Sequence, residues 1–278
     1  IFGNEPNCEL KDFDLWKRGL LNVQAEFKKR GLDRQVVLTG TDHSGGDPWH
    51  TRAVSELGEA LGAYDVHRYT RVEELDSGKL QAYFAKAWQE ARDRDPRAAA
   101  KPMIVGEAGL FVKGFSAGNN PLNMEYSYGV QMADYAVQAA NAGSSGVSAW
   151  MLDDNSHVNF VWGLWKNKAG GMALKPWFYT WSLLARLVRP EARIVATSPL
   201  PPGVRVLAAH MGESDWTFCL VNRNADTQPV RLQLPQGPRL TLHRYLYSPD
   251  SAKADANGFP RALDRAEADL ATGLDLPL

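Results

Sequence analysis

The chain has 278 residues with 31 basic and 32 acidic side chains, a formal net charge of −1 and two cysteines, Cys8 and Cys219. An apolar fraction of 44% argues against a disordered chain, and two cysteines provide no disulfide framework. The balanced charge gives no electrostatic reason to bind nucleic acid or an anionic membrane, and no apolar run is long enough to cross a bilayer.

Over the first 190 residues, short apolar runs alternate with helix-length amphipathic stretches. Gly31 stands where the C-cap glycine of the first long helix belongs. Repetition of strand and helix is typical of a parallel sheet or barrel, so the predicted fold class is α/β. The sequence predicts strands at 1–3, 36–39, 64–67, 102–105 and 146–150, and helices over 15–30, 51–61, 78–94, 128–142 and 173–188.

The pattern changes after residue 190, where short β-rich runs are separated by proline, glycine and asparagine turns. This predicts two domains, an α/β domain over 1–190 and a small antiparallel β domain over 191–278. The polar, alanine-rich stretch 248–278 is compatible with a partial helix or with a long β loop. The strands predicted in the second domain cover 194–197, 204–209, 216–221, 229–234 and 240–246.

Two glutamates, Glu5 and Glu107, directly follow predicted strands. The segments after the strands of an α/β barrel face one mouth, where such barrels place their active sites. Ionised glutamate is rarely found at the end of a buried strand without a function, although Glu5 could also be a plain helix N-terminal acid and Glu107 a loop acid. Two facing carboxylates are the groups that glycoside hydrolysis requires.

Other side chains after the same strands suit a sugar. Asn4 could hold a sugar hydroxyl, Tyr69 could donate a hydrogen bond to a charged carboxylate, and Trp150 offers a flat apolar face to a pyranose ring. The alternative for His67, Tyr69 and Trp150 is a packing role inside the fold.

A polar cluster follows the second predicted strand. A metal site is conceivable there, but the spacing matches no known ligand pattern, so the sequence predicts no metal and no cofactor. A loop that lines the substrate explains the cluster better. Its members are Asp42, His43, Asp47, Trp49 and His50.

Four segments resemble those of clan A glycoside hydrolases, and they occur in the right order. Gly3-Asn4-Glu5-Pro6-Asn7 resembles the Asn-Glu-Pro motif of the fourth barrel strand, in a form that is also similar to family 39. Residues 66–69 resemble the His-x-Tyr segment of the sixth strand in family 5, residues 104–109 the seventh strand with its nucleophile, and residues 148–150 the eighth-strand tryptophan.

This resemblance implies a (β/α)8 TIM barrel, of which strands four to eight are visible, followed by a small antiparallel β-sandwich. It implies a retaining β-glycoside hydrolase with Glu107 as nucleophile, Glu5 as general acid/base and Asn4 on the substrate 2-hydroxyl. A transglycosylase of the same clan and a non-catalytic carbohydrate-binding barrel remnant are the alternatives. The further substrate contacts that we expect are Asp42, His43, Trp49, His67, Tyr69 and Trp150.

The predicted barrel is incomplete, since a whole (β/α)8 barrel takes about 250 residues and half a barrel has two bare strand edges. We therefore expect the N-terminal half to come from the same full-length protein or from another chain. The expected partner is an oligo- or polysaccharide, with no nucleic acid and no membrane. A polysaccharide substrate favours a secreted or periplasmic location.

Overall fold

The computed structural model describes residues 3–45, 48–111, 120–155, 160–234, 239–249, 254–255 and 258–278. It divides into two compact units. Unit 1 comprises Ile1–Phe111 and Gln138–Trp150, and unit 2 comprises Val112–Val137 and Met151–Leu278. The domain boundary at residue 190 stays a prediction.

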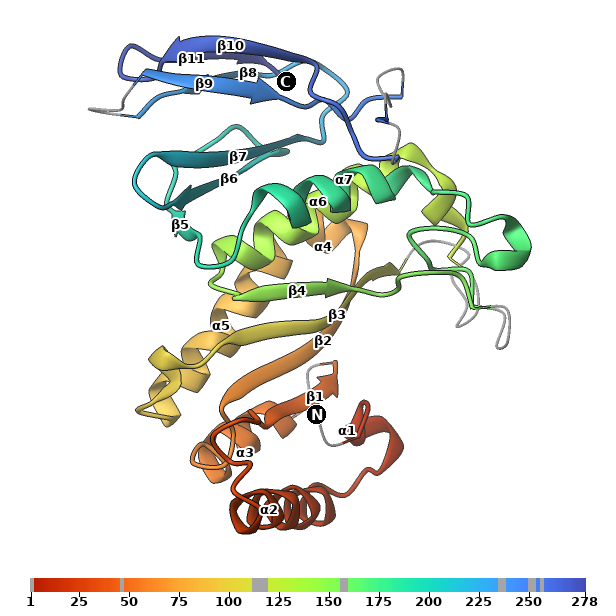
Figure 1. Ribbon diagram of the computed structural model, residues 1–278, viewed down its shortest axis with the longest axis vertical. Coiled ribbons are helices and arrows are strands. Elements are labelled where there is room, and N and C mark those ends of the chain that lie inside the picture. Colours follow the sequence, from red (N-terminus) through yellow and green to blue (C-terminus); the bar gives the residue numbers. More distant parts are fainter. Residues whose placement is uncertain are drawn as a thin grey trace. The chain divides into compact units, whose positions relative to one another are not determined.

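Unit 1 is built on a parallel sheet of four strands in the order β1-β2-β3-β4 (Figure 1). The mixed α/β class with parallel strands is thus confirmed. In the described part of the chain, β1 and β4 each pair with one neighbour, so the sheet is open at both edges. The strands are β1 (Thr39–Ser44), β2 (Ala63–Arg71), β3 (Met103–Phe111) and β4 (Gly146–Ala149).

The first strand of this sheet lies later than the sequence predicts. Val36 and Val37 are 40% and 63% exposed, and the N–H of Val36 bonds to Leu32 in the turn that follows the first long helix. The strand begins at Thr39 and buries a polar stretch, because its side chains face the inside of the site described below. The strand predicted at 1–3 lies mostly outside the described residues.

Helices follow the strands of unit 1 much as predicted. The Asp12 carboxylate caps α2 by accepting from the Leu15 N–H at 3.0 Å, and Gly31 ends it at a φ of 68°. α3 packs on β1 and on α5. The helices of this unit are α1 (Pro6–Glu9), α2 (Phe13–Lys29), α3 (Trp49–Glu56), α4 (Val72–Asp76), α5 (Lys79–Arg94) and the 3-10 turn η1 (Ala98–Ala100).

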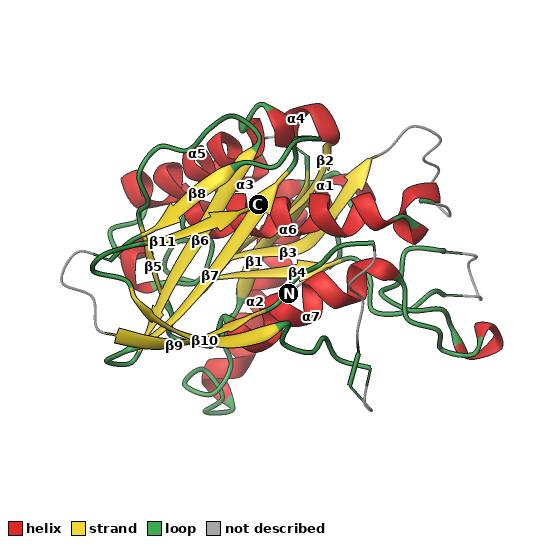
Figure 2. Cartoon of the chain, turned by 90° about the horizontal axis from the view of Figure 1, so that it is seen from above, coloured by secondary structure: helices red, strands yellow, loops and turns green. Residues whose placement is uncertain are grey.

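α6 (Tyr126–Asn141) begins in unit 2 and ends in unit 1, and α7 (Pro176–Leu187) belongs to unit 2. The chain between β4 and α7 is mostly loop (Figure 2). It contains the 3-10 turn η3 (Lys168–Gly170), and η2 (Pro121–Met124) precedes α6.

The remaining strands of unit 2 are antiparallel and form one three-stranded and two two-stranded sheets. The stretch 248–278 contributes two strands, β10 and β11, and no helix among its described residues. A β-sandwich made of these sheets stays a prediction. The strands are β5 (Arg193–Val195), β6 (Val204–Met211), β7 (Asp215–Asn222), β8 (Pro229–Leu232), β9 (Arg239–Arg244), β10 (Asp264–Asp269) and β11 (Leu274–Pro277).

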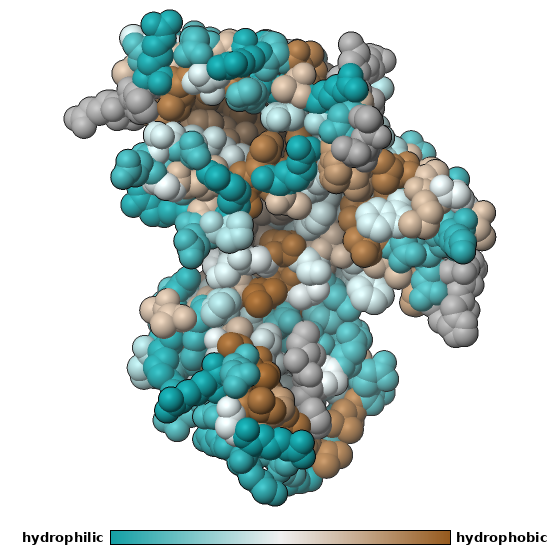
Figure 3. Space-filling model, viewed as in Figure 1, coloured by the Kyte–Doolittle hydropathy of each residue, from teal (hydrophilic) through white to brown (hydrophobic). Residues whose placement is uncertain are grey.

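Hydrophobic surface is exposed on unit 1 in the lower part of Figure 3, where Figure 1 places α2 and the segment before β1. Leu15, Leu21, Val36 and Val37 are the exposed apolar side chains of these segments. Among the described helices, none combines the length and the apolar character needed to cross a membrane.

Candidate active site

Three neighbouring strands of unit 1 place one ionisable side chain each at the same point of the sheet: Asp42 on β1, His67 on β2 and Glu107 on β3. His67 pairs directly with Glu107 in the register of β2 and β3. The β1–β2 pairing shifts between Thr41 and His43, and the β2–β3 pairing shifts at His67. Such bulges re-aim side chains and are common beside active sites.

Glu5 reaches this point from the start of α1. It has a left-handed backbone with a φ of 40°, and its N–H lies 3.3 Å from Asp42 Oδ2. The Asn7 side chain ties α1 to β1 twice, since its Nδ2 donates to the Ser44 carbonyl at 2.7 Å and its Oδ1 accepts from the Ser44 N–H at 3.0 Å. Glu5 is therefore held beside β1 by its own backbone N–H and by the side chain of Asn7, two residues later.

The His67 imidazole is the centre of the group. Its Nδ1 lies 3.0 Å from Glu5 Oε1 and 3.5 Å from Glu107 Oε2, and its Nε2 lies 2.8 Å from Asp42 Oδ1. One carboxylate oxygen of Glu5 and one of Glu107 lie within 4.8 Å of each other. The structure thus brings together two glutamates that are 102 positions apart in the sequence.

Tyr69 lies two residues beyond His67 on the same face of β2. Its hydroxyl donates to Glu107 Oε2 at 2.7 Å. This is the hydrogen bond that the sequence suggests for Tyr69, and it favours the charged form of the glutamate.

Both His67 nitrogens face carboxylate oxygens, which favours the doubly protonated imidazolium. Although burial opposes the charge, the hydrogen bonds to Asp42 and Glu5 raise the pKa of His67 to about 10. The same hydrogen bond from His67 lowers the pKa of Glu5, against a smaller opposing effect of burial.

Burial is the larger effect at Glu107, where it raises the pKa of the carboxyl despite the bond from Tyr69 and the charge on His67. The two glutamates therefore sit in different electrostatic environments: Glu5 is held ionised, whereas Glu107 is pushed toward protonation. Separated acid strengths are typical of a pair of carboxyls with different tasks, but here they run opposite to the resting states that the acid/base role of Glu5 and the nucleophile role of Glu107 require.

Asp65 is a fourth carboxyl of the cluster, and it is absent from the site residues that the sequence predicts. It is 2% exposed, its Oδ1 has no hydrogen-bond partner, and burial together with the Asp42 charge raises its pKa to about 7. A side chain at Gly106 would overlap this carboxylate, so the bulge in β3 requires glycine. Asp65, His67 and Tyr69 alternate along one strand, and period-two alternation was the signal that could have found Asp65.

Two residues of the predicted polar cluster pack away from the carboxylates. The Trp49 ring lies edge-on to Phe13, 5.1 Å between centroids, and 5.7 Å from the Trp16 ring. His50 Nε2 donates to the Ala87 carbonyl oxygen, 2.9 Å away, in the core next to α5. A substrate contact for Trp49 stays a prediction.

His43 is also buried, and its Nδ1 lies 2.7 Å from the Thr41 hydroxyl oxygen. Burial lowers the pKa of His43 to about 3, so this imidazole is neutral at physiological pH. Asp42 is the member of the predicted cluster that joins the carboxylates, and Asp47 lies outside the described residues.

Asn4 is exposed next to Glu5, and Trp150 follows the last residue of β4. The Trp150 N–H donates to the Ala108 carbonyl at 2.9 Å, one residue after Glu107. Both residues therefore belong to segments that border the cluster, and their contacts with a substrate stay predictions.

Two overlapping sets of side chains have ligand-type atoms close enough for a metal ion: Glu5, His67 and Glu107, and Asp42, Asp65 and His67. Both sets depend on His67, whose two nitrogens already contact carboxylates. The geometry is that of an ion-pair network centred on an imidazolium, and this protonated form cannot bind a metal.

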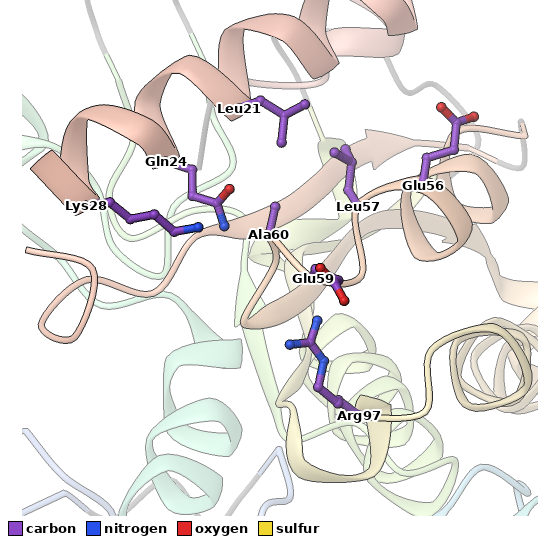
Figure 4. Close-up of a pocket in the computed structure, with 8 residues that line it drawn as sticks. All are labelled: Leu21, Gln24, Lys28, Glu56, Leu57, Glu59, Ala60 and Arg97. Atoms are coloured by element: carbon purple, nitrogen blue, oxygen red, sulfur yellow. The ribbon is translucent and has the colours of Figure 1, made fainter.

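A hollow of about 600 Å³ lies elsewhere in unit 1 (Figure 4). Leu21, Gln24 and Lys28 point into it from α2, facing the segment with Glu59 and Ala60. Its remaining lining comes from residues before β2 and β3, and none of it belongs to the cluster. It lies toward the amino ends of these strands, away from the cluster.

The chain resembles solved glycosidases in fold. It aligns with an α-L-arabinofuranosidase from Thermotoga maritima in an arabinose complex (TM-score 0.64, 13% identity, 96% of this chain and 60% of that one). It also aligns with a GH51 arabinofuranosidase from Xanthomonas axonopodis pv. citri (0.63, 14%, 84% and 54%) and with the GH30 subfamily 8 xylanase Xyn30A from Clostridium acetobutylicum (0.61, 10%, 90% and 55%).

These alignments show that the chain is similar in fold to solved clan A glycoside hydrolases, which confirms the resemblance at the level of the clan. The chain spans about half the length of the structures that it matches. No family model and no curated protein matches the sequence.

Proposed function

We propose that the protein is a retaining β-glycoside hydrolase, with Glu107 as the nucleophile and Glu5 as the general acid/base. The proposal rests on one observation, the approach of a Glu5 carboxylate oxygen to within 4.8 Å of one on Glu107. Retaining glycosidases hold their two carboxyl groups about 5–5.5 Å apart, whereas inverting enzymes leave about 6.5–9.5 Å for a water molecule.

In the proposed cycle Glu107 attacks the anomeric carbon while Glu5 protonates the departing oxygen. Glu5 then removes a proton from the water that hydrolyses the glycosyl–enzyme bond. The Tyr69 hydroxyl, 2.7 Å from Glu107 Oε2, supports the ionised nucleophile, and the His67 imidazolium supplies positive charge to both glutamates.

We further propose that the sheet of unit 1 is part of a (β/α)8 barrel and that the strands after residue 190 form an accessory β-sandwich. The open edges at β1 and β4 and the exposed apolar side chains before β1 support this, because bare parallel edges need partners.

The test is a panel of aryl glycosides: β-D-xylosides, β-D-glucosides and, given the fold neighbours, α-L-arabinofuranosides. ¹H NMR of the first product formed should show retention of the anomeric configuration. Glu5→Ala should lose activity on substrates with poor leaving groups and regain turnover with azide as a glycosyl azide. The matched control is Glu9→Ala, the exposed glutamate of the same helix, which should behave as wild type.

An inverted product, or full activity of Glu107→Ala, would contradict the mechanism. The transglycosylase alternative uses the same glutamates and is separated by product analysis with added acceptor sugars. The non-catalytic alternative predicts carboxylates that are splayed beyond about 10 Å or capped by side chains, and the observed separation argues against the first of these signs.

A further inference from the structure

The two oxygens of the Asp42 carboxylate have different partners, and both partners bear on the proposed acid/base. Oδ1 lies 2.8 Å from His67 Nε2, and Oδ2 accepts from the backbone N–H of Glu5 at 3.3 Å. One side chain thus orients the main chain of Glu5 and the imidazole that contacts its carboxylate. Asp42 itself is 2% exposed, which leaves little of it to touch a sugar.

The backbone at this position is unusual as well. Asp42 has a φ of 57°, in the left-handed region that few residues other than glycine, asparagine, aspartate and histidine adopt, and it occupies the register shift of β1. Glu5, its partner, is also left-handed. Two neighbouring strained residues that hydrogen-bond each other are typical of a functional site, where the surrounding structure enforces the geometry.

We propose that Asp42 is a positioning residue for the acid/base, and that Asp42, His67 and Glu5 form a chain through which His67 Nδ1 supplies the proton that Glu5 delivers. This inference rests on the proposed function. It changes the role of Asp42 from a substrate contact to a residue that acts through His67.

The proton balance follows from the hydrogen bonds. At rest the imidazolium has N–H bonds at Nδ1, toward Glu5, and at Nε2, toward Asp42. When a substrate excludes water, the Nδ1–H bond breaks and an O–H bond forms on Glu5, which leaves a neutral imidazole whose remaining hydrogen is held on Nε2 by Asp42. Glu5 then protonates the leaving oxygen, later recovers a proton from water and returns it to Nδ1.

Asp42 fixes which nitrogen exchanges the proton, much as the aspartate of a Ser-His-Asp triad fixes the tautomer of its histidine. The chain also explains why Glu5, held ionised at rest, can still act as an acid. The other titratable groups that face His67 lie on β1, β2 and β3, and they are His43, Asp65 and Glu107.

The test is Asp42→Asn. The amide keeps one oxygen acceptor, but its NH2 group would face an N–H donor, either that of Glu5 or that of His67 Nε2, and that hydrogen bond would be lost. We expect kcat to fall about 10- to 100-fold with KM within about 3-fold, and the alkaline limb of the kcat/KM profile to move at least one pH unit lower. The limb moves because His67 loses a negative neighbour and releases its proton more easily. Asp14→Asn, the same change at an exposed position of unit 1, should leave both unchanged.

A variant with an unshifted profile would overturn the proposal, even if its activity is uniformly lower, since a structural role alone lowers activity at every pH. If Asp42→Asn does not fold, ¹⁵N-histidine spectra of the unaltered protein decide. Among its six histidines, His67 should stay protonated on both nitrogens at pH 8. A singly protonated His67 at pH 7 would overturn the proposal.

These spectra need no substrate, so they separate this proposal from the proposed function. Absence of turnover on every aryl glycoside would overturn the function. In that case the ¹⁵N spectra would still report the protonation state of His67 and how it depends on Asp42.

Discussion

Unit 1 contains two buried groups of ionisable side chains, one around Asp95 and one around His67. They differ in how completely the negative charge of their carboxylates is compensated. Asp95, at the end of α5, accepts from the Tyr64 hydroxyl at 2.7 Å, from the Arg97 N–H at 3.0 Å and from the Lys101 ammonium group. Although burial opposes the charge, these bonds lower the pKa of Asp95. Each strong donor around Asp95 therefore serves a single carboxylate.

The cluster around His67 has fewer donors than carboxyls, because one imidazolium is shared among four of them. One of these carboxyls, Asp65, has a buried oxygen without a hydrogen-bond partner. A structural cluster lowers the energy of the folded state, whereas an undercompensated one keeps carboxyls close to the point where they gain or lose protons. From this comparison we propose that the His67 cluster serves chemistry and that the Asp95 cluster serves stability. Four substitutions test this distinction.

The largest expected effect is on activity, from Glu107→Ala. Loss of the proposed nucleophile should lower kcat at least about 10⁴-fold, which corresponds to about 5.5 kcal/mol of transition-state stabilisation. Steady-state kinetics on an aryl glycoside, with an unchanged melting temperature as control for folding, measure it. If the variant keeps more than a tenth of the wild-type activity, Glu107 is not the nucleophile.

Asp95→Ala should lower stability and leave the activity of the folded protein intact. It leaves Lys101, 8% exposed in its side chain, without its charge partner, which costs about 3–5 kcal/mol. The pKa of Asp95 is lower in the folded protein than in the unfolded chain. The contribution of Asp95 to the free energy of unfolding is therefore present above about pH 4 and is lost as the pH falls further. Urea unfolding measures it, with the exposed Asp93→Ala as the matched control.

Asp65→Asn should increase stability at alkaline pH. The pKa of Asp65 is raised to about 7, so the folded protein keeps a proton that the unfolded chain releases above about pH 4, and stability falls between these pH values. The amide removes that loss and should stabilise the protein at pH 8 by on the order of 3 kcal/mol. Equal pH dependence of unfolding in variant and wild type would show that Asp65 is charged in the folded protein.

Tyr69→Phe should have the smallest effect, a fall in kcat/KM of about 10- to 100-fold from the loss of one hydrogen bond to a carboxylate. Since the Tyr69 bond lowers the pKa of Glu107, the variant should also move the acid limb of the pH profile to higher pH. Tyr179→Phe in unit 2 is the control. An acid limb that stays in place would exclude Tyr69 as the group that keeps Glu107 ionised.

The sequence predicted the four described strands of the parallel sheet and most helix positions, because periodicity records which side of an element is buried. It predicted β1 too early, since the valines before it are more hydrophobic than the polar strand itself. Polar residues such as Thr41 and Asp42 form a strand here because their side chains find buried hydrogen-bond partners, Thr41 at His43 and Asp42 at His67. Local hydrophobicity does not contain that information.

Glu5, Glu107 and the partnership of Tyr69 with Glu107 could be inferred from residue types at the ends of strands. The tertiary structure decided that His67 is the centre of the cluster, that Asp42 rather than Trp49 or His50 reaches it, and that Asp65 lies beside them. The reason is that contacts across strands depend on the pairing register, and here the register shifts at Asp42 and at His67. A shift of one residue changes which side chains meet, and only the assembled sheet determines it.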